Sequence, residues 1–169
     1  MFVYEEAWNY EGYLNSDLLE YKVKQEKIFD KIELSLETQK KIKLIKNTVN
    51  IVIFAEIYCP DCRAVVPFLE KFSRLNNNFN INIFPREGNK SYISKHSKFS
   101  YIPLVLLEDI SKGEDEFVNI LEGSLPRIMS KMDNSVSKER EEAIYEFRTG
   151  KNNLELENYL IDKILEISL

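Results

Sequence analysis

Cysteine and histidine are scarce in this sequence, which has two cysteines and one histidine among 169 residues. A small secreted domain held together by disulfides would carry more cysteines at wider spacings. A zinc site usually needs four ligands, so Cys59, Cys62 and His96 could complete one only with carboxylates or a second subunit. We therefore expect no metal within one chain. A metal or cluster shared between two copies through the cysteines stays open as an alternative.

A long apolar run and a surplus of positive charge are also missing. No segment approaches the roughly 20 apolar residues of a membrane span. Residues 1–8 are acidic and lack the basic start and apolar centre of a signal peptide. The formal net charge of -5 argues against a general nucleic-acid binder. These absences predict a cytoplasmic protein that binds neither membranes nor nucleic acids. In that compartment an isolated, closely spaced cysteine pair is more often catalytic or metal-binding than structural.

Internal repeats and low-complexity linkers are absent as well, and the composition is ordinary, with 44% hydrophobic and 30% charged residues. A chain of this length suits one domain with a substantial core. We predict a single domain over residues 1–169. It would consist of an N-terminal helical extension (1–50), a core (51–123) and C-terminal helices (124–169).

The first half of the core has the pattern of a βαβ unit. Residues 51–55 form a short, β-branched apolar run, typical of a strand buried on both faces. An amphipathic helical pattern follows the cysteines and ends near the asparagines at 76–78. Residues 80–84 then alternate as a strand does. We expect parallel strands joined by a right-handed crossover.

The second half of the core predicts a hairpin. Residues 89–98 have the pattern of a short polar helix, and residues 103–107 and 117–121 are two further apolar runs. The turn signal at 111–114 lies between those runs and favours an antiparallel pair. The expected order is strand, helix, strand, helix, strand, turn, strand.

The flanking zones are both predicted to be helical. In residues 14–48 apolar positions recur at helical spacing, and Asn15 or Ser16 could cap the first helix. Residues 137–169 contain two candidate helices, the first of which stops at Gly150. We expect both zones to pack around the sheet.

The chemistry points to the run Cys59-Pro60-Asp61-Cys62, which joins a buried strand to an amphipathic helix. Free N–H groups and the dipole at a helix start stabilise a thiolate at the first cysteine. That thiolate is the nucleophile of disulfide exchange, and the second cysteine lies one turn away to resolve the mixed disulfide. Pro60 suits the first helical turn, where no N–H is needed.

Two buried structural cysteines are the alternative at this spacing. Such a pair would lie within an apolar helix face, whereas Pro60 and Asp61 favour a helix start near solvent. A lone C-x-x-C pair is a moderate signal, and its position at a strand–helix junction inside a βαβ unit strengthens it.

Residues 51–122 resemble the thioredoxin fold, most closely that of bacterial thioredoxin-like proteins with an added N-terminal helical segment. Cys59 and Cys62 match the redox pair, and Pro67 matches the proline that kinks the active-site helix. Ile102-Pro103 matches the cis-proline element that faces the dithiol, and Gly123 matches the glycine near the substrate groove.

The resemblance implies an α/β protein with a thioredoxin fold. It would have a central mixed four-stranded sheet (βαβ plus β-hairpin) flanked by helices, with added N- and C-terminal helices. It implies a thiol–disulfide oxidoreductase that reduces protein or small-molecule disulfides, needs no organic cofactor and receives electrons from a reductase or a low-molecular-weight thiol. We expect a cis Ile102–Pro103 bond within van der Waals reach of a cysteine. The resemblance implies that the substrate-binding residues are these: Tyr58, Pro60, Asp61, Ile102, Pro103 and Gly123.

The sequence departs from the thioredoxin pattern in the strand before the motif. Typical thioredoxins carry a buried acid that helps to move the proton of the second cysteine, and Ile53 stands in its place. Glu56 could take over proton transfer, although an odd separation puts it on the other face of a regular strand. Its alternative is a solvent-facing charge. The missing acid also favours a second hypothesis, a non-catalytic binding module on the same fold.

Charges near the motif should tune its thiols. Asp61 disfavours thiolate, so we expect a raised thiol pKa and a reducing potential, with Arg63 as a candidate to offset it. Arg86 and Arg127 follow strands on predicted loops. There they could lower the thiol pKa, bind an acidic substrate, or simply be solvated. His96 is expected to be exposed on a polar helix.

Overall fold

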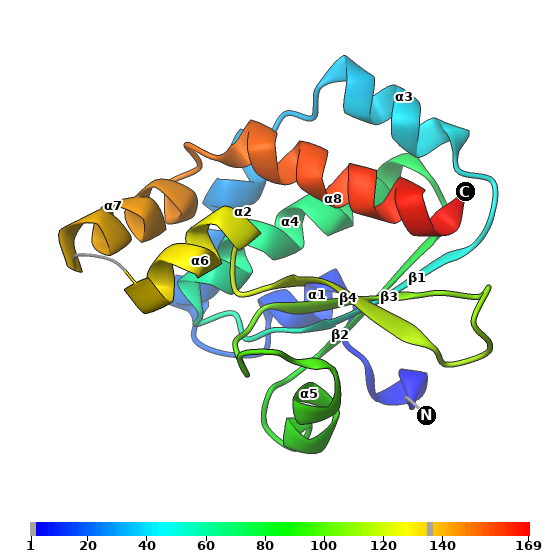
Figure 1. Cartoon of the computed structure of the whole chain (residues 1–169), viewed down its shortest axis with the longest axis horizontal. Coiled ribbons are helices and arrows are strands. Elements are labelled where there is room, and N and C mark those ends of the chain that lie inside the picture. The colour runs from blue at the N-terminus through cyan, green and yellow to red at the C-terminus, as the bar shows by residue number, and fades with distance from the viewer. Residues whose placement is uncertain (1–2, 135–136) are drawn as a thin grey trace.

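The computed structural model of the protein describes residues 3–134 and 137–169. It shows an α/β fold built on a mixed four-stranded sheet with strand order β2-β1-β3-β4 (Figure 1). The predicted strands and their order are therefore confirmed. The strands are β1 (Val49–Phe54), β2 (Phe79–Phe84), β3 (Leu104–Glu108) and β4 (Phe117–Glu122).

The strand β1 occupies a central position in the sheet. β1 pairs parallel with β2 and antiparallel with β3, which places Ile53 between Ile83 and Val105. β3 and β4 form the expected antiparallel hairpin. Residues 51–55 are fully buried because helices cover both faces of this central strand.

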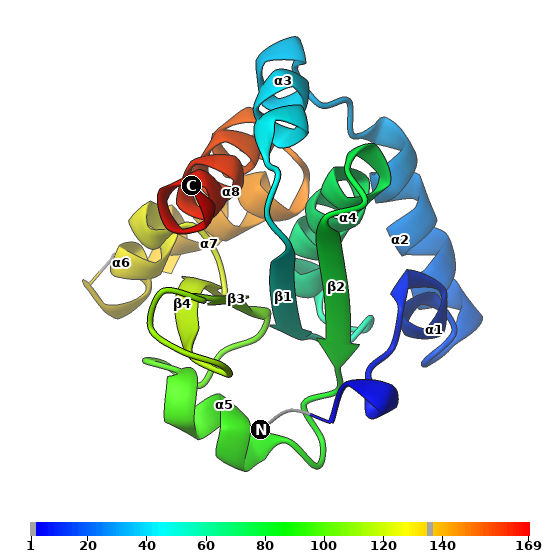
Figure 2. The same ribbon diagram turned by 90° about the vertical axis from the view of Figure 1, so that its right-hand side faces the viewer.

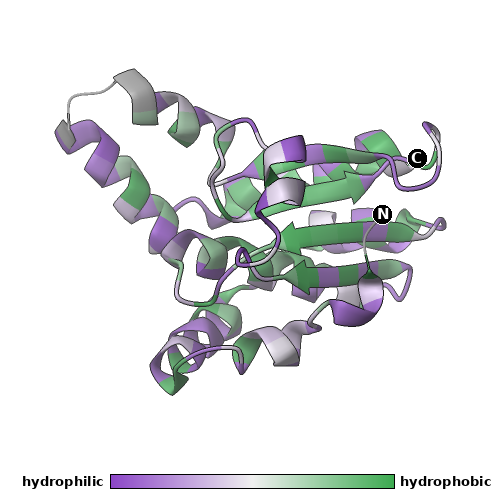
Figure 3. Ribbon diagram, turned by 90° about the horizontal axis from the view of Figure 1, so that it is seen from below, coloured by the Kyte–Doolittle hydropathy of each residue, from purple (hydrophilic) through white to green (hydrophobic). Residues whose placement is uncertain are grey.

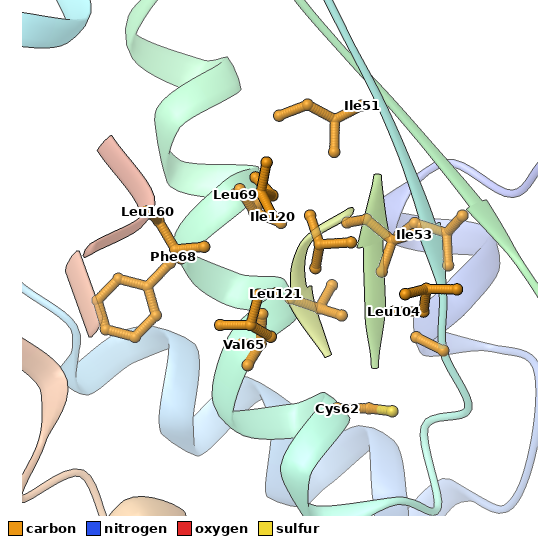
Figure 4. Packing of buried hydrophobic residues seen from close by; sticks show 14 of the residues in the cluster. Ile51, Ile53, Cys62, Val65, Phe68, Leu69, Leu104, Ile120, Leu121 and Leu160 are labelled. Carbon is orange, nitrogen blue, oxygen red and sulfur yellow. The ribbon is translucent and has the colours of Figure 1, made fainter. Parts of the chain in front are cut away.

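The helix α4 (Pro60–Leu75) crosses from β1 to β2 and carries the motif at its start. Pro60 occupies its first turn and Pro67 lies inside it, as expected. The helix ends where Asn76 turns to donate hydrogen bonds to two carbonyl oxygens of the segment before β1. Its inner face joins the main core, where Val65, Phe68 and Leu69 are nearly or fully buried (Figure 4).

Helices cover the sheet on both sides. In Figure 1, α4 and α8 (Asn153–Ser168) lie over one side, whereas α5 (Lys90–His96) lies on the other. Figure 3 shows strands that are mainly hydrophobic and surrounding helices with mixed surfaces. In the described part of the chain, no helix combines the length and apolar character that crossing a membrane requires.

The N-terminal extension corrects one expectation. Figure 2 shows α1 (Tyr10–Leu14) and α2 (Leu19–Lys31) beside the edge strand β2. The expectation that Asn15 or Ser16 caps the first helix of residues 14–48 is wrong, because that helix is α2, whose N-cap position is Leu18 without a side-chain cap hydrogen bond. Asn9 caps α1 by accepting a hydrogen bond from the Gly12 N–H at 2.8 Å, and Asn15 stands at the end of that helix. The chain breaks after α1, so the apolar spacing that began at Leu14 runs across two separate helices. The rest of the extension comprises the short 3₁₀ helix Tyr4–Glu6 and α3 (Leu36–Leu44).

The C-terminal segment holds three helices in the described residues, α6 (Pro126–Asn134), α7 (Ser137–Arg148) and α8. The end of α7 next to Gly150, which has a φ of +87°, confirms the expected stop. The expectation that Arg127 lies on a loop is wrong, because Pro126 opens a helix there.

Candidate active site

The dithiol lies where β1 ends and α4 begins. Cys59 is the N-cap of α4 and is partly exposed, whereas Cys62 is completely buried, and both are free thiols. The Cys62 N–H points at Cys59 Sγ from 3.4 Å. Figure 4 shows Cys62 on the first turn of the helix, at the end of the buried cluster that includes Val65 and Leu104. One sulfur is thus accessible and the other is covered.

The pKa values of the two thiols are shifted in opposite directions. A hydrogen bond from the Cys62 thiol is the largest influence on Cys59. This hydrogen bond and the backbone N–H groups at the helix start lower the pKa of Cys59. Burial and the charge of Asp61 act in the opposite direction but are outweighed. Burial is the main reason why the pKa of Cys62 is raised well above its ordinary value. The expectation that Asp61 leaves the attacking thiol with a raised pKa is therefore wrong, because these hydrogen bonds outweigh its charge.

Asp61 has an ion-pair partner that the sequence did not reveal. Arg148, at the end of α7, donates to both carboxylate oxygens at 2.8 and 3.1 Å. Arg63, the expected partner, instead donates to the carbonyl of Ile57 at 2.7 Å and lies over the ring of Tyr21. No local pattern could have identified Arg148, because it is 87 positions from Asp61.

The loop opposite the dithiol confirms the expected geometry. The Ile102–Pro103 peptide bond is cis, and the carbonyl oxygen of Ile102 lies 3.8 Å from Cys59 Sγ. The Gly123 N–H donates to the Pro103 carbonyl at 2.8 Å. Gly123 has a φ of +73°, and a Cβ atom there would stand 2.9 Å from Met129 Sδ. Only glycine can adopt this positive φ and also leave room for Met129 without strain.

Glu122 organises this loop, and sequence reasoning missed it. Its buried carboxylate accepts hydrogen bonds from Ser97 Oγ and from the N–H groups of Lys98 and Phe99, each at 2.7 Å, and from Tyr101 N–H at 3.2 Å. Burial would raise the pKa of Glu122, but these hydrogen bonds outweigh it and lower the pKa. The one available signal was an acid at the last position of β4, directly after the apolar pair Ile120 and Leu121.

Glu56 is turned towards the end of β2. Its Oε1 atom accepts a hydrogen bond from the Arg86 N–H at 2.8 Å, whereas its backbone adjoins the Cys62 sulfur. Proton transfer by Glu56 stays a prediction. Tyr58 is 46% exposed beside the motif, and its pKa is raised by burial first and then by Glu56.

A buried polar pair from the N-terminal extension lies behind Cys62. Tyr13 is fully buried and donates its hydroxyl hydrogen to Gln25 Oε1 at 2.8 Å. Gln25 in turn donates to the backbone carbonyl of Arg63 at 3.0 Å. Burial, followed by the charge of Cys62, raises the pKa of Tyr13 well above its ordinary value. Ile53 is fully buried in β1, whereas Tyr13 and Gln25 bring buried polar atoms to the start of α4 from α1 and α2.

An apolar cavity of about 280 Å³ opens beside Cys59. Its walls come from the cis-proline loop, the end of β4, and helices α6 and α7. Arg86 also lines this cavity. This position beside the dithiol is the one needed if Arg86 is to lower the thiol pKa or bind an acidic substrate.

Arg127 and His96 are engaged elsewhere. Arg127 pairs with Glu155 at 2.7 Å. The expectation that His96 is exposed is wrong in part, because the residue is half-buried with its ring against that of Phe117. Within the described residues, no group of three or more His, Cys, Asp or Glu side chains could hold a metal ion.

Comparison with known proteins assigns the fold. A family model described as thioredoxin matches residues 8–150. A solved protein of unknown function from Pseudomonas aeruginosa is similar with a TM-score of 0.75 and 16% identity, over 97% of this chain and 93% of that chain. An HIV epitope scaffold is similar with a TM-score of 0.69 and 18% identity, over the same 97% and 93%. Likeness at these identities concerns the fold alone. No curated protein matches the chain significantly.

Proposed function

The chain belongs to the thioredoxin family, and on that premise we propose that it is a thiol–disulfide oxidoreductase that reduces protein or small-molecule disulfides. The observation that carries the proposal is the contrast between its two thiols. Cys59 is accessible with a lowered pKa, and Cys62 is buried with a raised pKa. A dithiol catalyst needs this contrast, because one sulfur attacks as a thiolate while the other waits protonated.

In the first step the Cys59 thiolate attacks one sulfur of the substrate disulfide. The substrate S–S bond breaks, a mixed disulfide forms at Cys59, and the first substrate sulfur departs as a thiolate. Cys62 then loses its proton to that thiolate or to water and attacks Cys59 Sγ. The second substrate sulfur leaves as a thiolate, and a Cys59–Cys62 disulfide remains. Two electrons have passed from the dithiol to the substrate, so a reductase or a low-molecular-weight thiol must restore it.

The cis-proline loop would position the substrate. The Ile102 carbonyl lies 3.8 Å from the attacking sulfur, so an extended chain placed along Ile102 and Pro103 would bring its disulfide to Cys59. Tyr58, Pro60, Asp61 and Gly123 would border this path. The proposed setting is the cytoplasm, where thiol donors keep such a dithiol reduced.

A disulfide-reduction assay with insulin, supplied with a dithiol donor, tests this function. Wild-type protein should accelerate reduction, Cys59→Ser should abolish the acceleration, and Cys62→Ser should accumulate mixed disulfides. Folding of each variant is checked by circular dichroism. Equal reduction by wild type and Cys59→Ser would refute the proposal and favour a non-catalytic binding module.

A further inference from the structure

The cavity beside Cys59 is built largely by helices outside the sheet. We call it the α6–α7 cavity. Its apolar wall consists of Ile128, Met129 and Met132 from α6 and Ile144 and Phe147 from α7. Its other wall contains Cys59, Ile102 and Ser124. The nucleophile and the cis-proline loop therefore open onto the same apolar space.

The size of this cavity limits what it can hold. Its volume of about 280 Å³ is less than the roughly 300–1,000 Å³ of most small-molecule sites. It equals the liquid volume of only about nine waters, at ~30 Å³ each. One large side chain fits this space, which lies at the lower edge of the range for small-molecule sites. Met129 and Met132 add flexible thioethers that can adapt to side chains of different shapes.

Two polar groups at the cavity favour a peptide as the occupant. Ser124 is 6% exposed, and its buried hydroxyl has no hydrogen-bond partner among the described residues. A buried hydroxyl without a partner is costly, and a peptide N–H or C=O of a bound chain could satisfy it. The nearby Ile102 carbonyl, 3.8 Å from Cys59 Sγ, marks where that chain would cross the nucleophile.

Charged side chains at the rim of the α6–α7 cavity also favour some substrates over others. Arg148 and Asp61 line the rim but neutralise each other as an ion pair. The exposed Arg86 guanidinium forms no ion pair with the described residues, and Glu56 binds only the Arg86 backbone and does not line the cavity. Arg86 is therefore the one cation lining the cavity whose side chain has no ion-pair partner among the described residues.

We propose that the substrates are protein disulfides flanked by a large apolar residue, which enters the α6–α7 cavity, and by an acidic residue, which pairs with Arg86. This inference rests on the proposed function and narrows its substrate class. Burial of a large side chain should increase reactivity on the order of 10- to 100-fold over alanine. An exposed ion pair with Arg86 should add about two- to fivefold.

The test uses short peptides whose single cysteine is joined by a disulfide to a common chromogenic thiol. The residue beside the cysteine is alanine, leucine or phenylalanine, and a further position is glutamate or lysine. Reduced wild-type protein is mixed with each peptide, and release of the chromogenic thiol gives a second-order rate constant. The symmetric chromogenic disulfide, which has no peptide, serves as the reference substrate.

The variants test the two contacts separately. Ile144→Trp should fill the cavity and lower the phenylalanine-to-alanine rate ratio towards one, whereas Leu154→Trp on the exposed side of α8 should leave that ratio unchanged. Met132→Glu is a second cavity variant at a half-buried position, in case Ile144→Trp fails to fold. Arg86→Glu should reverse the glutamate-over-lysine preference. Lys46→Glu, an exposed site with the same charge change, should preserve it.

The outcomes separate this inference from the function on which it rests. Wild-type protein that reduces the reference disulfide but treats all peptides alike overturns the inference and leaves the function standing. A phenylalanine preference that survives in both cavity variants overturns the assignment to the α6–α7 cavity. Absence of reaction with the reference and with every peptide overturns both.

Discussion

Replacement of Arg148 by glutamine should make Cys59 less reactive at neutral pH. Arg148 holds both oxygens of Asp61 at 2.8 and 3.1 Å, and the Asp61 charge raises the pKa of Cys59. The Arg148 side chain is 40% exposed and that of Asp61 is 23% exposed, so solvent screens the pair. Exposed ion pairs contribute about 0.2–1 kcal/mol. An increase of 1 kcal/mol in the cost of ionising Cys59 reduces the thiolate population about fivefold, since ~1.4 kcal/mol corresponds to tenfold.

Alkylation by iodoacetamide measures this population, because only the thiolate reacts. Below the pKa of Cys59 the rate constant of Arg148→Gln should be about two- to fivefold lower than that of wild type. At high pH both should reach the same plateau, so the whole profile shifts to higher pH. Mass spectrometry identifies which cysteine is modified. We expect modification at Cys59, because Cys62 is buried.

Two further variants make the result decisive. Asp61→Asn should shift the profile to lower pH, and combining it with Arg148→Gln should return the profile close to that of wild type. Arg127→Gln removes a comparable ion pair, with Glu155 at 2.7 Å, and should leave Cys59 unchanged. Coincident profiles for wild type and Arg148→Gln, or a shift to lower pH, would refute the reasoning.

Three other substitutions test the surroundings of the dithiol. Tyr13→Phe leaves buried Gln25 Oε1 without its donor and should reduce the free energy of unfolding by about 1–3 kcal/mol, measured with urea; an unchanged midpoint would contradict this contact. Glu122→Gln places amide donors against N–H donors and should reduce stability at pH 7 by about 1–3 kcal/mol. Because the folded pKa of Glu122 is lowered, its stabilisation is complete above the unfolded pKa and lost as pH falls through the folded pKa. The variant should therefore lose less stability than wild type on acidification below about pH 4.3, seen in thermal melts; parallel curves would count against it. Gly123→Ala should cost about 1–3 kcal/mol, because its φ is +73° and a Cβ would stand 2.9 Å from Met129 Sδ; Gly113→Ala, at a turn whose nearest neighbour is 3.7 Å away, controls for the clash.

Local patterns were enough to predict the sheet and the position of the dithiol. A short β-branched run such as residues 51–55 favours a buried strand, and Pro60 favours the first turn of a helix. The fold around Cys59 therefore follows from a few adjacent residues. The start of α2 was misplaced because Asn15 and Ser16 have side chains able to cap a helix, whereas the N-cap position is Leu18, which has no capping side chain.

Long-range partners could not be predicted in this way. Arg148 is one of 23 basic residues, and nothing near it in the sequence marks it as the partner of Asp61. Tyr13 likewise looks like an ordinary core aromatic until the fold brings it to Gln25 and the start of α4. These contacts depend on how helices pack, which hydrophobic spacing constrains only weakly.

These long-range contacts give the terminal helices a role beyond packing around the sheet. From the sequence, both terminal zones were expected only to pack around the sheet. In the structure the N-terminal zone contacts the start of α4 through Tyr13 and Gln25, and α7 places Arg148 beside Asp61, whose charge opposes ionisation of Cys59. Each thiol is thus influenced by a segment outside the sheet, from a different side. A substitution in α7 should therefore act on attack by Cys59, and one in α1 on resolution by Cys62. Single-turnover kinetics would separate the two, because mixed-disulfide formation and its resolution are distinct phases. Slower attack with unchanged resolution in Tyr13→Phe would contradict this division.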